Sequence, residues 1–290
     1  MTSQQTVLVA GVTGQQGSAV ARRLLDTGFA VRGLTRDPDS EKARPLRDLG
    51  VELVRGDTRR ADSIHAALAG VDGAFAMATP FEAGTDDEVA QGTGFGDAAK
   101  RAGVRHFVYS SVGGAERDSG IPHFESKWRI EQHLRSLDLP LTVFRPVWFF
   151  ENFGTYSTQP VDDGYAIMAP MSPDRPLQGV AVDDIAAFVL QAFSDPDRWI
   201  GREVELAGDE RTMPQYAEAI ARATGARVVY QQIPWEDVRA QSEDLAKTFE
   251  WFERAGYEAD IAGLRELHPG LKTFEQWLAE GKLAHLRKAV

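Results

Sequence analysis

Short apolar runs alternate with segments of helical periodicity through the first half of the chain. Runs of four to six mostly apolar residues indicate buried strands, and apolar residues spaced three and four apart indicate helices. The predicted strands are Thr6–Ala10, Ala30–Thr35, Val51–Val54, Gly73–Met77, His106–Ser110 and Leu141–Arg145. The predicted helices are Gln15–Thr27, Ser40–Leu49, Ala61–Ala69, Thr85–Ala102 and Pro122–Leu137. This alternation predicts an α/β fold, a doubly wound parallel sheet with helices on both faces and right-handed crossovers.

The alternation stops after Pro146. An aromatic apolar run, Val147–Phe150, follows with no further strand-turn-helix unit behind it. The later predicted elements are a strand at Gly179–Val182, a helix at Asp183–Phe193, a strand at Glu203–Leu206, a helix at Pro214–Thr224, a strand at Arg227–Ile233 and helices to the end. We therefore predict a main domain over residues 1–146 and a smaller C-terminal α/β lobe over 147–290, with some segments returning to the main sheet.

A glycine-rich turn follows the first predicted strand directly. It reads Gly11-Val-Thr-Gly14-Gln-Gln-Gly17, and the third glycine opens a helix. In such a turn the first glycine allows a tight bend, the second lets a pyrophosphate approach the backbone, and the third lets the helix pack on the strand. The helix start then offers free N–H groups to the phosphates. Because a strand precedes the turn and a helix follows it, we predict a Rossmann-type dinucleotide-binding domain.

The end of the second predicted strand indicates which dinucleotide binds. An acidic residue there holds the ribose 2′-hydroxyl of NAD, whereas a nearby arginine accommodates the 2′-phosphate of NADP. The strand ends Thr35-Arg36-Asp37, so the last strand position is neutral and an arginine follows it. Asp37 competes with this interpretation, but it precedes Pro38 and suits a turn. We predict that Arg36 binds the 2′-phosphate, and that NADP binds more tightly than NAD.

Composition and charge exclude several other classes. The net charge is −11, from 32 basic and 43 acidic residues, so direct nucleic-acid binding is not expected. The chain has no cysteine, and its six histidines lack ligand spacing, so thiol chemistry is excluded and no metal site is predicted. No apolar stretch approaches the roughly 20 residues that span a bilayer, and the first residues lack a basic leader. We expect a cytoplasmic protein, a monomer or homodimer, away from the membrane.

Several short motifs along the chain match one family in combination. They are Gly11-Val-Thr-Gly14-Gln-Gln-Gly17, Thr35-Arg36-Asp37-Pro38, Gly56-Asp57, Tyr109-Ser110-Ser111, His123-Phe-Glu-Ser-Lys127, Arg145-Pro146, Phe150-Glu151-Asn152-Phe153 and Leu271-Lys-Thr-Phe-Glu-Gln-Trp277-Leu. With these motifs the chain resembles the NmrA-like branch of the short-chain dehydrogenase/reductase superfamily over its whole length.

The resemblance implies an NADP-binding fold of the extended, atypical kind and assigns roles to individual residues. The implied cofactor-binding residues are Gly11, Thr13, Gly14, Gln16 and Gly17 in the turn, Arg36 at the 2′-phosphate, Asp57 near the adenine, Thr79 and Pro80 lining the cleft, Lys127 at the nicotinamide ribose, and Pro146 facing the nicotinamide. Some members of this family sense the dinucleotide without turning it over, and others reduce quinones or other small molecules.

The catalytic motif of the wider superfamily is altered in this chain. That motif is Tyr-x-x-x-Lys, in which the lysine lowers the tyrosine pKa so that the phenol can exchange a proton with a carbonyl oxygen. Here Lys127 is kept, but His123 stands where the tyrosine belongs. The candidate catalytic residues are therefore Lys127, His123 and Ser111, which follows the fifth predicted strand. His123 can donate a proton near neutral pH, or it can line a site that has lost catalysis, and both interpretations stay open.

Two functions of different kinds follow from these residues. The first is a dinucleotide-responsive redox sensor, in which NADP biases one conformation and a regulatory protein partner reads it. The second is an NADPH-dependent oxidoreductase that reduces a small quinone or carbonyl substrate, a reaction in which the cofactor carries the chemistry. Sugar epimerases and dehydratases are disfavoured, because those enzymes normally need the tyrosine that is missing here.

Overall fold

The computed structural model describes residues 4–286. Seven strands form one parallel sheet in the order β11-β6-β5-β4-β1-β2-β3. Its strands are β1 (Thr6–Val9), β2 (Ala30–Thr35), β3 (Glu52–Arg55), β4 (Gly73–Met77), β5 (His106–Ser110), β6 (Leu141–Pro146) and β11 (Glu203–Leu206). This is the order of a doubly wound Rossmann sheet, extended by one strand beyond β6, and the predicted fold class is confirmed.

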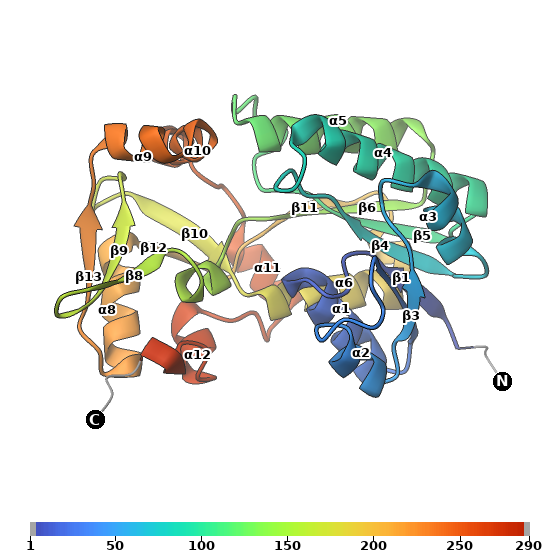
Figure 1. Ribbon diagram of the computed structural model, residues 1–290, viewed down its shortest axis with the longest axis horizontal. Coiled ribbons are helices and arrows are strands. Elements are labelled where there is room, and N and C mark those ends of the chain that lie inside the picture. Colours follow the sequence, from blue (N-terminus) through green and yellow to red (C-terminus); the bar gives the residue numbers. More distant parts are fainter. Residues whose placement is uncertain (1–3, 287–290) are drawn as a thin grey trace. The chain divides into compact units, whose positions relative to one another are not determined.

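Helices cover both faces of this sheet. On one face lie α3 (Ala61–Leu68), α4 (Thr85–Ala102) and α5 (Pro122–Ser136), and on the other lie α1 (Gln15–Asp26), α2 (Arg44–Asp48) and α6 (Val182–Ser194) (Figure 1). Four predicted strands, β2, β4, β5 and β11, and the predicted helix Thr85–Ala102 match the structure end to end. Helix α2 is shorter than predicted because Ser40 still belongs to a turn, in which its amide and hydroxyl donate to the Asp37 carbonyl.

Two glycines in α4 set how closely α5 packs against it. A Cβ at Gly92 would lie 2.6 Å from Ile130 Cδ1, and a Cβ at Gly96 would lie 2.2 Å from Leu134 Cδ2. Ile130 and Leu134 are fully buried in the core between α5 and the sheet. The glycines thus let the α5 backbone approach α4, and α5 carries both His123 and Lys127.

A buried ionic cluster ties α5 to the sheet edge. Arg145 at the end of β6 forms ion pairs with Glu131 at 2.7 Å, Glu203 at 2.7 Å and Glu116 at 3.2 Å. The Glu131 side chain is fully buried, and that of Arg145 is 8 % exposed. Removing one partner of such a group leaves an uncompensated buried charge, so the cluster fixes how α5 sits on β6 and β11.

The remaining chain forms two small sheets and a helical end. The sheets have the orders β12-β10-β7 and β13-β9-β8. Their strands are β7 (Trp148–Phe149), β8 (Thr158–Val161), β9 (Gly164–Ala169), β10 (Pro176–Val180), β12 (Asp209–Thr212) and β13 (Val228–Gln232). The helices here are α8 (Met213–Thr224), α9 (Trp235–Gln241), α10 (Glu243–Arg254), α11 (Ile261–Leu267) and α12 (Phe274–Ala279), and a short α7 (Pro196–Trp199) precedes β11. The sequence analysis did not predict the β8–β9 hairpin.

The predicted boundary between the strand Gly179–Val182 and the helix Asp183–Phe193 is wrong. The strand predicted at Gly179–Val182 is β10, which ends at Val180, and α6 already begins at Val182. Asp183 and Asp184 therefore lie in the first turn of α6, where acidic side chains interact favourably with the helix dipole. The apolar run hides this boundary because residues 179 to 182 are buried in strand and helix alike.

The chain divides into two compact units, each made of three segments. Unit 1 contains residues 1–116, 122–145 and 185–204, and unit 2 contains 117–121, 146–184 and 205–290. The predicted division into domains 1–146 and 147–290 stays a prediction. Within residues 4–286, none of the helices combines the length and the apolar character needed to cross a bilayer.

His106, the first residue of β5, gives unit 1 a dependence on pH. Its side chain is 3 % exposed and bonds to Thr142 Oγ1 at 2.8 Å, and burial lowers its pKa from 6.5 to about 4. Since the unfolded chain then takes up the proton first, the His106 contribution to stability is complete above pH 6.5 and falls as the pH drops toward 4. We expect a loss of up to about 3 kcal/mol over this range. Urea unfolding at several pH values checks it, and His106→Gln is expected to flatten the curve. An unchanged slope in this variant would contradict the assignment.

Candidate functional site

The sheet brings most of the predicted cofactor residues to one edge. In a parallel sheet all carboxyl ends face the same side, and ligands bind where the strand order reverses. Here the order reverses between β1 and β4, which pair in parallel. The residues that follow the strands at this edge are Gly11 after β1, Arg36 after β2, Asp57 after β3, Thr79 and Pro80 after β4, and Ser111 after β5, while the buried Pro146 ends β6.

The glycine-rich turn has the geometry that the sequence predicts. Gly11 has a φ of +59°, and the Gly14 amide donates to its carbonyl at 2.8 Å. A Cβ at Gly17 would lie 2.2 Å from the Gly11 oxygen, so only glycine lets α1 start this close to β1. Gly14 is the N-cap of α1, no side chain caps the helix, and its first turn carries no acidic residue. The first amides of α1 have no partner within the helix, so they suit an anion such as a diphosphate.

Two serines follow one another at the end of β5 and differ in their partners. The Ser110 hydroxyl donates to Gln16 Oε1 at 2.7 Å, which ties the first turn of α1 to β5. The Ser111 amide donates to the Phe144 carbonyl at 2.7 Å. The Ser111 Oγ is buried and has no hydrogen-bond partner among residues 4–286. A hydroxyl in this state suits a role in contacting a ligand, as predicted for Ser111.

Arg36 forms an ion pair within unit 1. Its guanidinium donates two bonds to Glu82, from Nη1 to Oε2 at 2.7 Å and from Nη2 to Oε1 at 2.8 Å. This carboxylate raises the pKa of Arg36, and the Arg36 side chain is still 61 % exposed. Asp37 holds the following turn, because its Oδ1 accepts the Asp39 amide at 3.1 Å. The interpretation of Asp37 as a turn residue is confirmed, and Arg36 is an exposed arginine held by Glu82.

The two other predicted contacts with the cofactor lie in loops. Asp57 Oδ1 accepts the Arg59 amide at 3.0 Å, and the Asp57 amide donates to Ser63 Oγ at 2.7 Å. Asp57 is half-buried, as are Thr79 and Pro80. Thr79 Oγ1 lies 3.5 Å from the Phe81 amide. The adenine and cleft contacts assigned to these residues stay predictions.

Lys127 is held inside unit 1. Its ammonium donates to Glu88 Oε1 at 2.7 Å and to the Ala78 carbonyl at 2.9 Å, and its side chain is only 12 % exposed. Glu88, on α4, is fully buried and also accepts a bond from the Ser126 hydroxyl. Lys127 is therefore not an exposed surface lysine. An ammonium has three donors, so one remains for a ligand such as a ribose hydroxyl.

His123 and Tyr109 are the other groups relevant to proton transfer. His123 is the second residue of α5, is half-buried, and packs edge-on against Phe124 at 4.9 Å between ring centroids. Tyr109 is fully buried in the core, where desolvation raises the pKa of its phenol well above the usual value. Tyr109 is therefore a packing residue of this core. Tyr109 does not replace the missing catalytic tyrosine, because full burial in the core keeps its phenol away from a substrate.

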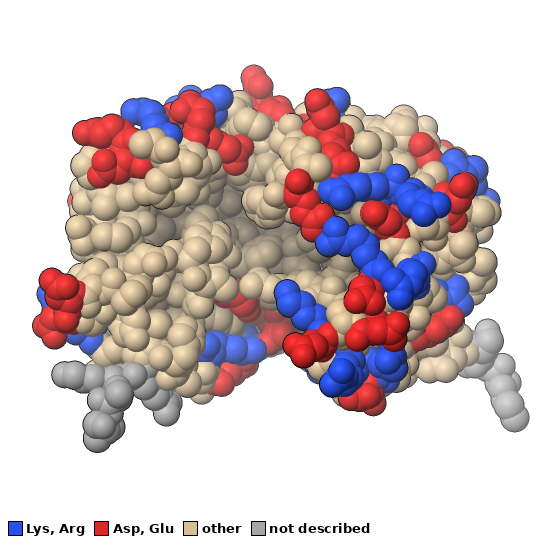
Figure 2. Space-filling model, in the orientation of Figure 1, with Lys and Arg blue, Asp and Glu red and all other residues tan. Residues whose placement is uncertain are grey.

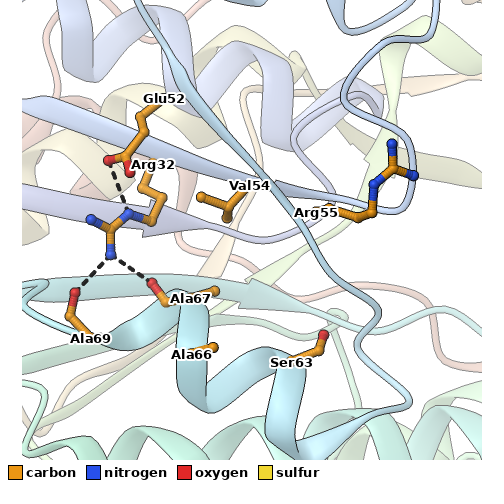
Figure 3. A pocket seen from close by; sticks show the side chains of 8 residues that line it. All are labelled: Arg32, Glu52, Val54, Arg55, Ser63, Ala66, Ala67 and Ala69. Atoms are coloured by element: carbon orange, nitrogen blue, oxygen red, sulfur yellow. Dashed lines mark hydrogen bonds and ion pairs between the residues drawn. The ribbon is translucent and has the colours of Figure 1, made fainter.

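A separate pocket of about 370 Å³ is lined by residues of β2, β3 and α3, at the β3 edge of the sheet (Figure 3). It is lined by Arg32, Glu52, Val54, Arg55, Ser63, Ala66, Ala67 and Ala69. Arg32 donates to Glu52 and to the carbonyls of Ala67 and Ala69, which end α3. None of the residues predicted to bind the cofactor lines this pocket. Its arginine satisfies a helix C-terminus, a structural role.

Three residues of this edge were missed by the sequence analysis. Glu82 pairs with Arg36, Glu88 pairs with Lys127, and Arg59 lies 3.5 Å from Glu82. The acidic run Asp86-Asp87-Glu88 stands at the start of a predicted helix, which explains any acidic residue there by the helix dipole. Helical spacing places Glu88 on the buried face of α4 together with Gln91 and Phe95. A carboxylate predicted to be buried needs a cationic partner, and this signal could have identified Glu88.

Comparison with known proteins decides the family. A model of the NmrA-like family matches residues 3–278. The chain belongs to the NmrA-like family. An NmrA-like family domain-containing protein of Dictyostelium discoideum is 29% identical to it, over 94% of this chain and 96% of that protein. The NmrA-like oxidoreductase FrzB of a Cladobotryum species is 30% identical, over 86% of this chain and 84% of that protein.

Solved structures of the NmrA-like family agree with this assignment. The crystal structure of NmrA, a negative transcriptional regulator, in complex with NADP has a TM-score of 0.82 and 26% identity, covering 96% of this chain and 95% of NmrA. A second NmrA structure, at a TM-score of 0.81 and 25% identity, contains NAD, and the coverage of both chains is the same. These two structures show that NmrA accommodates NADP as well as NAD.

Proposed function

We propose that this NmrA-like protein binds NADP(H) and acts as a dinucleotide-responsive regulator, whose bound state is read by a protein partner. The observation that carries the proposal is the environment of Lys127. Its ammonium is held by Glu88 and the Ala78 carbonyl, and the residue four positions before it is His123. The tyrosine–lysine pair that moves a proton in the wider short-chain dehydrogenase/reductase superfamily is therefore missing, while the parts that would hold a dinucleotide are kept.

The cofactor assignment is supported by three features of unit 1. A Cβ at Gly17 would collide with the backbone of Gly11, so the start of α1 lies close to β1. The first amides of α1 can then bind the diphosphate. Arg36 presents a planar fork suited to a 2′-phosphate. The third donor of Lys127 can hold a ribose hydroxyl without breaking its two existing bonds. NmrA, the structural relative, has been solved with NADP and with NAD.

The second candidate is an NADPH-dependent oxidoreductase for a small quinone or carbonyl compound. It is favoured by the buried Ser111 hydroxyl, which lacks a partner among residues 4–286, and by the name of the relative FrzB. Bound NADPH would supply a hydride from its nicotinamide ring. Ser111 would orient the acceptor oxygen of the substrate, and His123 would hold the proton that this oxygen takes up.

Steady-state oxidation of NADPH with a panel of quinones and aldehydes separates the two candidates. A regulator is expected to bind NADPH tightly in calorimetry and to show no turnover above the rate without protein. An oxidoreductase is expected to show turnover that falls at least about 100-fold in His123→Ala or Ser111→Ala, the range of general acid catalysis. Turnover of this kind would refute the regulator. Absence of binding to either dinucleotide would refute both candidates.

The preference for NADP makes a separate prediction. Arg36→Ala is expected to weaken NADP binding about 10- to 100-fold, because hydrogen bonds to charged groups contribute roughly 1.5–3 kcal/mol. Binding of NAD, which has no 2′-phosphate, is expected to change less than about twofold. Isothermal titration with both nucleotides checks this. Equal losses for the two would rule out a contact between Arg36 and the 2′-phosphate.

A further inference from the structure

A bridge of three charged side chains joins the loops at the NADP end of the proposed site. Arg36 follows β2, Arg59 lies between β3 and α3, and Glu82 lies between β4 and α4. Arg36 donates hydrogen bonds to both carboxylate oxygens of Glu82. Arg59 Nη2 lies 3.5 Å from Glu82 Oε2. Over unit 1, Figure 2 shows basic side chains lying among acidic ones. Two guanidinium groups thus converge on one small anion.

Arg59 is held in this position from its other side. Its Nε donates to both oxygens of Asp87, at 2.9 Å and 3.1 Å, in the first turn of α4. The Asp87 bond raises the pKa of Arg59. The Arg59 side chain is 33 % exposed, compared with 61 % for Arg36. Asp87 therefore anchors Arg59 while leaving Nη2 directed at the same point as the Arg36 fork.

The Glu82 carboxylate belongs to an exposed loop, so it can move away from the two arginines. Glu82 is 49 % exposed and sits in a loop whose last residue, Gly84, has a φ of +86°. The neighbouring Phe81 is 89 % exposed, so the loop is not anchored by an apolar side chain. The Arg36 guanidinium lowers the pKa of Glu82, which is therefore ionised at neutral pH. Exposed ion pairs of this kind add little stability, so a stronger anion can displace the carboxylate.

We infer that Arg36 and Arg59 together form the 2′-phosphate site, and that Glu82 occupies this site until NADP replaces it. The inference rests on the proposed function, since it takes the 2′-phosphate contact of Arg36 as its starting point. A phosphate monoester carries up to two charges and three acceptor oxygens, against one charge and two oxygens for a carboxylate. The phosphate therefore satisfies both arginines better than Glu82 does. NAD leaves the bridge intact, so the two dinucleotides leave the loop from Pro80 to Gly84 in different states.

Titration of four single variants with NADP and with NAD tests this inference. Arg59→Ala is expected to weaken NADP binding about 10-fold, by loss of a charge-assisted bond, and to change NAD binding less than twofold. Glu82→Gln keeps the size of the side chain but removes the competing charge. It is expected to tighten NADP binding about 2- to 5-fold and to leave NAD unchanged. Arg36→Ala tests the proposed contact between Arg36 and the 2′-phosphate of NADP.

Arg105→Ala is the matched control. Arg105 also pairs with an acidic side chain, that of Asp72, but it lies at the opposite, amino-terminal edge of the sheet. Both nucleotides are expected to bind this variant as they bind the unchanged protein. Losses that are equal in Arg59→Ala and Arg105→Ala would reduce the effect to net charge and overturn the inference.

The outcomes separate the inference from the function on which it rests. If Arg36→Ala discriminates between the nucleotides but Arg59→Ala and Glu82→Gln do not, the second arginine and the competing carboxylate are refuted and the proposed function survives. If Arg36→Ala does not discriminate, the 2′-phosphate assignment itself fails. Weaker NADP binding in Glu82→Gln would make Glu82 a support of the site and would refute its role as a competitor. Thermal unfolding of each variant confirms that it is folded before titration.

Discussion

Alanine in place of Gly17 is expected to weaken binding of NADP and NAD alike by at least about 100-fold. The added Cβ would lie 2.2 Å, 2.6 Å and 2.9 Å from the Gly11 oxygen, the Gly11 carbonyl carbon and the Ala10 oxygen, all of them backbone atoms. No side chain can turn away to relieve this contact, so the turn between β1 and α1 must shift. The amides that would receive the diphosphate move with it, and isothermal titration measures the loss.

Gly94 supplies the control for this substitution. It lies in α4, and a Cβ there meets no atom within 4 Å. Alanine at an open helical position is expected to stabilise the protein by about 0.5–1 kcal/mol and to leave binding unchanged. The Gly17→Ala variant is expected to be destabilised by about 1–3 kcal/mol, as overpacked cores are. Normal dinucleotide affinity in a folded Gly17→Ala protein would show that the turn does not hold the diphosphate.

Methionine in place of Lys127 is expected to destabilise the protein by about 3–5 kcal/mol, because it leaves the charge of Glu88 buried and unpaired. Glu88 has no exposed surface, and its remaining bond comes from the Ser126 hydroxyl. Urea unfolding measures the loss. The double variant with Glu88→Gln is expected to lose at least about 1 kcal/mol less than the sum of the two single losses, which is the signature of a direct pair.

Lys100 provides a matched lysine for this test. It also donates to a backbone carbonyl, that of Asp138, at 2.7 Å and lies 3.8 Å from the carboxylate of the same residue, but its side chain is 47 % exposed. Lys100→Met is expected to cost less than about 1 kcal/mol. Similar losses for the two lysines would contradict a structural ion pair at Lys127. A fall in turnover in any Lys127 variant is interpretable only after its stability has been measured.

The hydrophobic pattern was enough to predict the sheet and its order of elements. The inner strands β1 and β4 are apolar and buried because helices cover both faces of the sheet, and turn residues such as Gly11 and Asp37 follow soon after β1 and β2. The boundary at Val182 was missed because strand and helix meet inside one apolar run. Periodicity cannot locate a change of period within four buried residues.

The candidate site was predicted in its backbone parts but not in its charged partners. Each of Gly11, Gly14 and Gly17 has a steric role in the turn that depends only on neighbouring residues in the sequence. The turn could therefore be predicted from this short segment alone. The partners Glu82 and Glu88 stand 46 and 39 residues from Arg36 and Lys127. Their pairing depends on how β2, β4, α4 and α5 come together, and a charge pattern along one chain does not contain that information.

The route of the backbone between the two units has a consequence for expressing parts of this protein. The first unit is complete only when residues 185–204 return to it, and part of β11 with most of α6 lies in that segment. A fragment that stopped at residue 146 would leave the backbone groups along β6 open to pairing with other molecules. Neither half can therefore be cut out as a continuous piece, and ribosomal synthesis must pass well beyond the nucleotide-binding motifs before the sheet can close.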